Sequence, residues 1–158
     1  MQLVWQKGKF SWIASRPERD IDFSPNFPQI EPPDNAQVLE LCAALLSYGG
    51  EAVVVLFEEE NANELFARHG EIVNFKSLKF KIGEERQCHE NSAKLWKSNE
   101  DKFCLMTGYG LSDDGLWRRH SWVIDDEADV VETTLERTLY FGIRLNRDQA
   151  NAFWQIYK

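Results

Sequence analysis

All five prolines of the chain lie between residues 17 and 33, and no proline follows Pro33. Proline lacks a backbone N–H and disrupts helices and interior strands, so the proline-free remainder is where regular elements can form. The length of 158 residues is close to that of one ordinary domain. We therefore expect a single domain over residues 1–158, with an irregular N-terminal segment over residues 1–34 and a folded core over residues 35–158.

Apolar periodicity and capping residues predict the elements of this core. The expected helices run from Asp34 or Asn35 to Gly49-Gly50, from Asn61 to His69, from Cys88 to Ser98, and from a capping box at Asn146 and Gln149 to about Tyr157. The expected strands cover residues 52–57, 102–110, 120–125, 130–135 and 138–145. Because helices come first and an antiparallel meander follows, the expected fold class is α+β.

The charge of the chain excludes two classes of partner. The formal net charge is −8, and neither half of the chain is basic. Phosphate backbones and anionic lipids would repel such a protein, so we expect neither nucleic acid nor a membrane surface as a partner.

No apolar stretch approaches the roughly 20 residues of a membrane-spanning helix, and charge interrupts the start before a signal peptide could form. Three cysteines are too few for a disulfide scaffold, which favours a reducing, cytoplasmic location.

Three residues in one continuous segment could carry chemistry. Cys88 opens the predicted helix over residues 88–98, His120 lies in a predicted strand, and Glu132 lies in the next strand. In the first turn of a helix, unpaired N–H groups and the positive end of the helix dipole favour a nucleophilic thiolate. A nucleophile needs a base within hydrogen-bond reach, and that base needs an acceptor on its other nitrogen. The segment supplies one candidate for each role.

The length of the turn between the two strands decides which way Glu132 points. An odd turn, over residues 126–128 or 125–129, places Trp122 opposite Glu132 and brings the carboxylate to the face of His120. A four-residue turn over residues 126–129 reverses the parity and points Glu132 away. We favour the odd turn, although the sequence leaves both open.

The order of a cysteine helix, a histidine strand and an acid strand resembles the catalytic core of the papain-like cysteine hydrolases, especially the transglutaminase-like branch. His120-Ser121-Trp122 resembles the His-x-Trp strand of that branch, and Val131-Glu132-Thr133-Thr134 resembles its acid strand. Cys88–Thr134, with Gly108-Tyr-Gly and Asp114-Gly-Leu-Trp, also resembles an uncharacterised group of small bacterial proteins. The resemblance implies a papain-like core and a Cys88-His120-Glu132 triad that acts without a cofactor on amide, isopeptide or thioester bonds of a peptide or protein substrate.

Further residues are expected to bind the substrate or its oxyanion. The backbone N–H of Cys88 and the side chain of Gln87 are the oxyanion donors that we expect. Tyr109 precedes the histidine strand, where it could face the thiol. The expected groove-lining or substrate-binding residues are Tyr109, Trp117, Arg118, Arg119 and Trp122.

Two alternatives stay open. Zinc could use Cys88, His89, Cys104 and His120, but these spacings do not match a paired-ligand motif, so we expect no metal, and we interpret His89 as a solvated or capping residue. The second alternative is a non-catalytic protein-binding module, such as an immunity or regulatory protein, that keeps the fold. The acidity of the chain supports it, as do departures from the family pattern: Glu132 replaces Asp or Asn, no proline follows it, and no glutamine lies six residues before Cys88.

Overall fold

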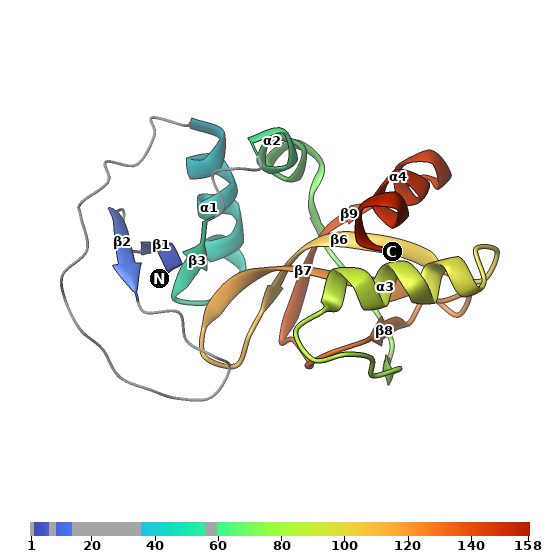
Figure 1. The fold of residues 1–158 in the computed structure, drawn as a ribbon. Helices are drawn as coiled ribbons and strands as arrows, with labels where there is room; N and C mark the ends of the chain where they lie inside the picture. The colour runs from blue at the N-terminus through green and yellow to red at the C-terminus, as the bar shows by residue number, and fades with distance from the viewer. Residues whose placement is uncertain (1, 7–8, 14–35, 56–59) are drawn as a thin grey trace. The chain divides into compact units, whose positions relative to one another are not determined.

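A computed structural model describes residues 2–6, 9–13, 36–55 and 60–158, which form four helices and a multi-stranded sheet (Figure 1). The α+β class is therefore confirmed. The chain divides into two compact units, Met1–Arg68 with Leu111–Arg118, and His69–Gly110 with Arg119–Lys158. Strands β6 and β7 each contribute residues to both units. The expectation of a single domain stays a prediction. Within the described residues, no helix is long and apolar enough to cross a membrane.

The first unit pairs N-terminal strands with a short central strand. Strand β1 (Gln2–Gln6) pairs antiparallel with β2 (Lys9–Ile13) and with β3 (Ala52–Val54), and β3 pairs in parallel with the first residues of β7 (Leu116–Ile124). Residues 2–6 and 9–13 are thus strands, where we expected irregular structure, whereas residues 14–34 lie outside the described residues. Strands of five residues give little periodicity, and the pairing of β1 with β3 is not visible locally.

The helices of this unit lie close to their expected positions. Helix α1 (Ala36–Tyr48) buries Val38, Leu41, Cys42 and Leu45 and is followed by Gly49 and Gly50, whose φ angles are 134° and 84°. Such angles favour glycine and end the helix. Helix α2 (Glu60–His69) also matches its prediction.

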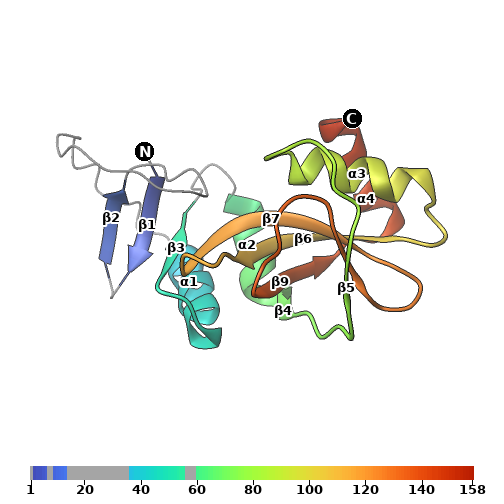
Figure 2. The same cartoon turned by 90° about the horizontal axis from the view of Figure 1, so that it is seen from below.

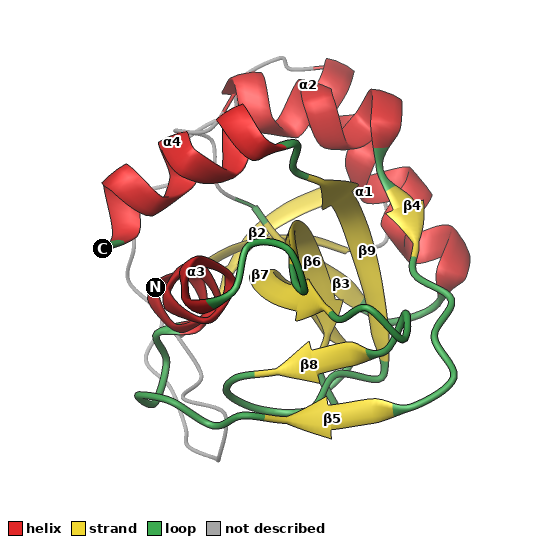
Figure 3. Cartoon of the chain, turned by 90° about the vertical axis from the view of Figure 1, so that its right-hand side faces the viewer, coloured by secondary structure: helices red, strands yellow, loops and turns green. Residues whose placement is uncertain are grey.

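The second unit contains the remaining elements. Its helices are α3 (Cys88–Ser98) and α4 (Arg147–Tyr157), which lie side by side (Figure 3). Its strands are β4 (Glu71–Ile72), β5 (Leu78–Phe80), β6 (Cys104–Leu111), the later part of β7, β8 (Val130–Glu132) and β9 (Leu139–Arg144). Side chains from α3, α4, strands β6, β7 and β8 and the residue just before β6 form one apolar core: Trp96, Phe103, Leu105, Val123, Val131 and Ala150.

The strand order corrects the expected meander. A meander would place β9 beside β8, but the order is β7-β6-β9-β4 (Figure 2). Strand β8 pairs with β7, on the side away from β6. The short edge strand β5 pairs in parallel with β8. These pairings join segments far apart in the chain, and local patterns carry no information about such contacts.

The β7–β8 hairpin has the odd turn. Val123 lies opposite Val131 and Ile124 opposite Val130, which places Trp122 opposite Glu132. The N–H of Asp125 donates to the carbonyl oxygen of Asp129 at 3.0 Å, closing a turn over residues 125–129. Nζ of Lys79 on β5 lies 2.6 Å from Asp125 and 3.2 Å from Asp129. A lysine of the neighbouring strand therefore offsets part of the negative charge of this acidic turn.

Gly108 lets β6 and β9 approach closely, and its replacement provides a first prediction. A Cβ atom at position 108 would overlap the carbonyl oxygen of Phe141 and the Cα of Gly142, which are backbone atoms that cannot move aside alone. We expect Gly108→Ala to lower the free energy of unfolding by about 1–3 kcal/mol in urea titrations. The matched comparison is Gly110→Ala, whose Cβ would meet side-chain atoms of Arg137 instead of backbone, so its loss should be smaller. Equal losses in the two variants would contradict the close backbone packing.

Candidate active site

The N-terminus of α3 places the cysteine as predicted. The helix begins at Cys88, and its N-cap residue Gln87 makes no side-chain capping bond. Asn91, one turn into the helix, holds the preceding loop: its Oδ1 accepts from the N–H of Glu84 at 3.1 Å, and its Nδ2 donates to the carbonyl oxygen of Glu84 at 2.7 Å. A Cβ atom on Gly83 would lie 2.5 Å from this amide group. The loop that leads to the thiol is therefore fixed by a side chain of the same helix.

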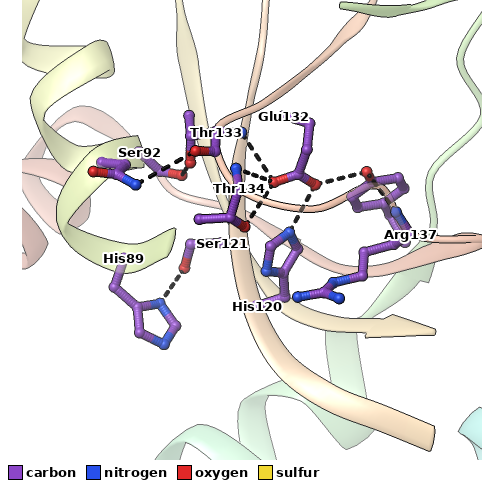
Figure 4. A network of polar contacts seen from close by, with 10 residues as sticks. His89, Ser92, His120, Ser121, Glu132, Thr133, Thr134 and Arg137 are labelled. Carbon is purple, nitrogen blue, oxygen red and sulfur yellow. Dashed lines mark hydrogen bonds and ion pairs between the residues drawn. The ribbon is translucent and has the colours of Figure 1, made fainter. Parts of the chain in front are cut away.

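Strand β7 supplies His120, and β8 supplies Glu132 (Figure 4). Nε2 of His120 lies 2.9 Å from Oε2 of Glu132, and both side chains have an exposed fraction of 0%. This pairing follows from the odd turn, because Glu132 then lies diagonal to His120 on the same face.

The carboxylate of Glu132 accepts five hydrogen bonds. Its Oε1 accepts from the N–H groups of Thr133 and Thr134, both at 2.9 Å, and from the hydroxyl of Thr134 at 3.1 Å. Its Oε2 accepts from Tyr140 at 2.8 Å in addition to His120. Sequence reasoning missed these partners. The two threonines directly after the acid were a usable signal, whereas Tyr140 on β9 had none.

The charges of these groups support one another. Burial raises the pKa of Glu132, but the hydrogen bond and charge of His120, with the Thr134 N–H and Tyr140, outweigh burial, so the pKa is lowered. Burial lowers the pKa of His120, but interactions with Cys88 and Glu132 outweigh it, so the pKa is raised. Glu132 is thus ionised at neutral pH, and the proton on Nε2 of His120 points at it.

The ionisation equilibrium of Cys88 is shifted towards the thiolate. Burial opposes its ionisation, but the neighbouring His120 with its charge, the backbone N–H of Ser121 and the charge of Arg137 together lower the pKa of Cys88. With Nε2 engaged by Glu132, Nδ1 is the nitrogen of His120 left for the sulfur. Nδ1 itself makes no hydrogen bond to any of the described residues, so it can receive the proton of the thiol. The arrangement can hold a thiolate beside an imidazolium, as a thiol nucleophile requires.

Several residues expected to bind substrate are buried. Trp122 packs on His120, with 6.0 Å between ring centroids, and on Tyr140, whereas Tyr109 is buried below the guanidinium of Arg119. Nη1 of Arg119 donates to the carbonyl oxygen of Gly108 at 2.9 Å. These aromatic side chains pack the sheet and are closed to solvent in this conformation.

Two other expected groove residues belong to the first unit. Trp117 is fully buried, and its Nε1 donates to the carbonyl oxygen of Gly49 at 2.9 Å. Both terminal nitrogens of Arg118 bind Asp114, at 2.9 and 2.7 Å. These hydrogen bonds of Trp117 and Arg118 all lie within the first unit.

His89 differs from its interpretation as a solvated or capping residue. It is half-buried, and its Nδ1 lies 2.6 Å from the hydroxyl of Ser121 on β7 (Figure 4). Among the described residues, no three side chains of His, Cys, Asp or Glu gather in a group that could hold a metal ion.

Comparisons with protein-family models, with curated proteins and with solved structures find no match to the chain.

Proposed function

We propose that the protein is a thiol hydrolase or acyltransferase with a papain-like or transglutaminase-like core, which acts on amide, isopeptide or thioester bonds. The observation that carries the proposal is the buried pair of His120 and Glu132, 2.9 Å apart, beside a cysteine whose pKa is lowered. A buried ionic pair is costly, and its position beside a helix-terminal thiol is what nucleophilic catalysis requires.

The mechanism follows from these three groups. The thiolate of Cys88 attacks the substrate carbonyl carbon, and the N–H of Cys88 with the side chain of Gln87 stabilises the oxyanion. As the bond to the leaving group breaks, the leaving nitrogen or sulfur takes the proton from Nδ1 of His120. A water or an amine then attacks the acyl-enzyme, gives its proton to Nδ1 and releases the thiolate. Glu132 holds the ring and stabilises its cation throughout.

The alternative is a non-catalytic protein-binding module that retains this fold. It is favoured by the net charge of −8 and by the burial of the aromatic side chains that were expected to bind substrate. In such a module the His120–Glu132 pair would be structural, and Cys88 would behave as an ordinary thiol. The reactivity of the thiol separates the two functions.

The test is the pH dependence of alkylation at each cysteine. With iodoacetamide and peptide mass spectrometry, we expect the rate at Cys88 to rise with pH through a pKa below the usual 8.5 and then to level off. Burial raises the pKa of Cys42 to about 12 and raises that of Cys104, so these two cysteines are internal controls that stay slow. His120→Gln should cut the rate at Cys88 at pH 6 by about tenfold or more, because each unit of pKa changes the thiolate fraction tenfold.

Activated thioesters and esters provide a second readout. The wild-type protein should release one equivalent of leaving group in a burst and hold the acyl group on Cys88. Cys88→Ser should abolish the burst, and Cys104→Ser should leave it unchanged. An ordinary pKa at Cys88 together with no burst would exclude the hydrolase and favour the binding module.

A further inference from the structure

His89 is a half-buried titratable residue that the mechanism does not use. It follows Cys88 on α3, and its partner Ser121 follows His120 on β7. Two consecutive residues of the helix thus contact two consecutive residues of the strand. Cys88 meets His120, and His89 meets Ser121.

The hydrogen bonds fix the tautomer of His89. The hydroxyl of Ser121 donates its single proton to Oγ1 of Thr107 at 2.9 Å. Ser121 must therefore accept from His89, so the proton lies on Nδ1 and the 2.6 Å contact is an N–H···O bond. The chain of donors runs from α3 through β7 to β6.

The surroundings keep the ring neutral and in place. Burial first, and then the positive charges of Arg119 and His120, lower the pKa of His89 to about 3. Tyr157 and Phe153 of α4 cover the ring, with centroid distances of 5.1 and 6.0 Å. A neutral imidazole with Nδ1 already engaged is a poor general base, but it is a rigid hydrogen-bond donor.

We propose that His89 is a positioning residue of the active site. By donating from Nδ1 to Ser121, it fixes the first turn of α3 on β7 and thereby holds the sulfur of Cys88 at the imidazole of His120 and at the N–H of Ser121. This inference rests on the proposed function, because it concerns the geometry of the same nucleophile.

The test compares side chains that do and do not replace Nδ1. The amide nitrogen of Asn occupies a position close to Nδ1, whereas Leu has no donor and the amide of Gln lies one bond farther out. We expect His89→Leu and Ser121→Ala each to slow the alkylation of Cys88 at pH 6 by about tenfold and to raise its apparent pKa. His89→Asn should stay within about twofold of the wild type, and His89→Gln should behave like His89→Leu. The double variant His89→Leu/Ser121→Ala should be no worse than either single one, because both remove the same bond.

A control separates positioning from a loss of packing. Phe153→Leu removes a ring from the cover of His89 but keeps the hydrogen bond, so it should lower the unfolding midpoint and leave the pKa of Cys88 unchanged. If His89→Leu folds and Cys88 keeps its wild-type pKa, the positioning role is wrong. The same holds if His89→Asn behaves like His89→Leu.

The imidazole nitrogen resonances of His89 test the bond independently of catalysis. In the wild type they should show a neutral ring with the proton on Nδ1, and Ser121→Ala should change that signal. If Cys88 has an ordinary pKa while this signal is intact, the proposed function is wrong, although the bond between His89 and Ser121 exists. A ring protonated on Nε2 would overturn the positioning role, whatever the reactivity of Cys88.

Discussion

Replacing Glu132 by alanine will lower the free energy of unfolding by about 3–5 kcal/mol, because it removes one partner of a buried charged pair. The carboxylate has an exposed fraction of 0% and accepts from His120, Tyr140 and the backbone after it. Without it, the imidazole and the N–H of Thr133 remain buried, and the N–H of Thr134 remains partly buried, without the carboxylate as acceptor. Each lost partner adds a desolvation cost.

Urea unfolding followed by tryptophan fluorescence measures this loss. The control is Glu85→Ala, whose side chain is 86% exposed and which should change the free energy of unfolding by less than about 0.5 kcal/mol. Similar values for the two variants would mean that the carboxylate of Glu132 is not buried and paired as described.

The pH dependence of stability gives the same residue a second readout. The pKa of Glu132 is lower in the folded chain than in the unfolded chain, where it is about 4.3. Its stabilising contribution is therefore complete above the unfolded pKa and is lost as the pH falls through the folded pKa. In Glu132→Gln this part of the acid-induced loss should be absent. A wild-type acid slope in that variant would contradict the assignment.

Trp122→Ala is the second change with a large expected effect, a loss of about 3–5 kcal/mol in the free energy of unfolding. Trp122 is fully buried in an apolar cluster with Met106, Ile124, Val130 and Tyr140. Its ring also packs on the imidazole of His120. Truncation would leave a cavity on one side of the imidazole of His120, so the loss combines lost burial with lost packing.

The matched variants show whether packing is the cause. Trp122→Phe keeps an aromatic ring and should lose clearly less stability than the alanine variant, with Cys88 still alkylated rapidly at pH 6. Trp154→Ala on α4 removes a partly buried tryptophan from the other apolar cluster and should cost less than Trp122→Ala. If Trp122→Ala is as stable as the wild type, Trp122 is not the core residue that the structure describes.

Local signals predicted much of the second unit. Helix α3 begins at Cys88 and ends at Ser98, as its amphipathic pattern indicated. Both hydrogen bonds of the capping box between Asn146 and Gln149 are present. The parity of the β7–β8 hairpin is the odd one, as favoured, because an ionisable side chain on an apolar face needs a partner. In each case, residues close in sequence contained the information.

Contacts between distant segments could not be predicted in this way. The pairing of β9 with β6 depends on Gly108 and Gly142, whose lack of side chains matters only once the two strands meet. The parallel pairing of β5 with β8 brings Lys79 to the acidic turn, although 46 residues separate it from Asp125. Tyr140 lies only eight residues after Glu132, but its contact with Glu132 depends on the pairing of β9 with β6 rather than with β8. The candidate triad itself stays a prediction of function.

The way in which Glu132 is surrounded has a consequence for how a reaction would start. Folding alone supplies every donor that the carboxylate needs, from protein groups and without any group of a ligand. The dipoles around the imidazole are therefore preorganised, and a bound molecule would not have to reorient them before bond making begins. Association energy would then remain available for holding the scissile bond in line with the sulfur.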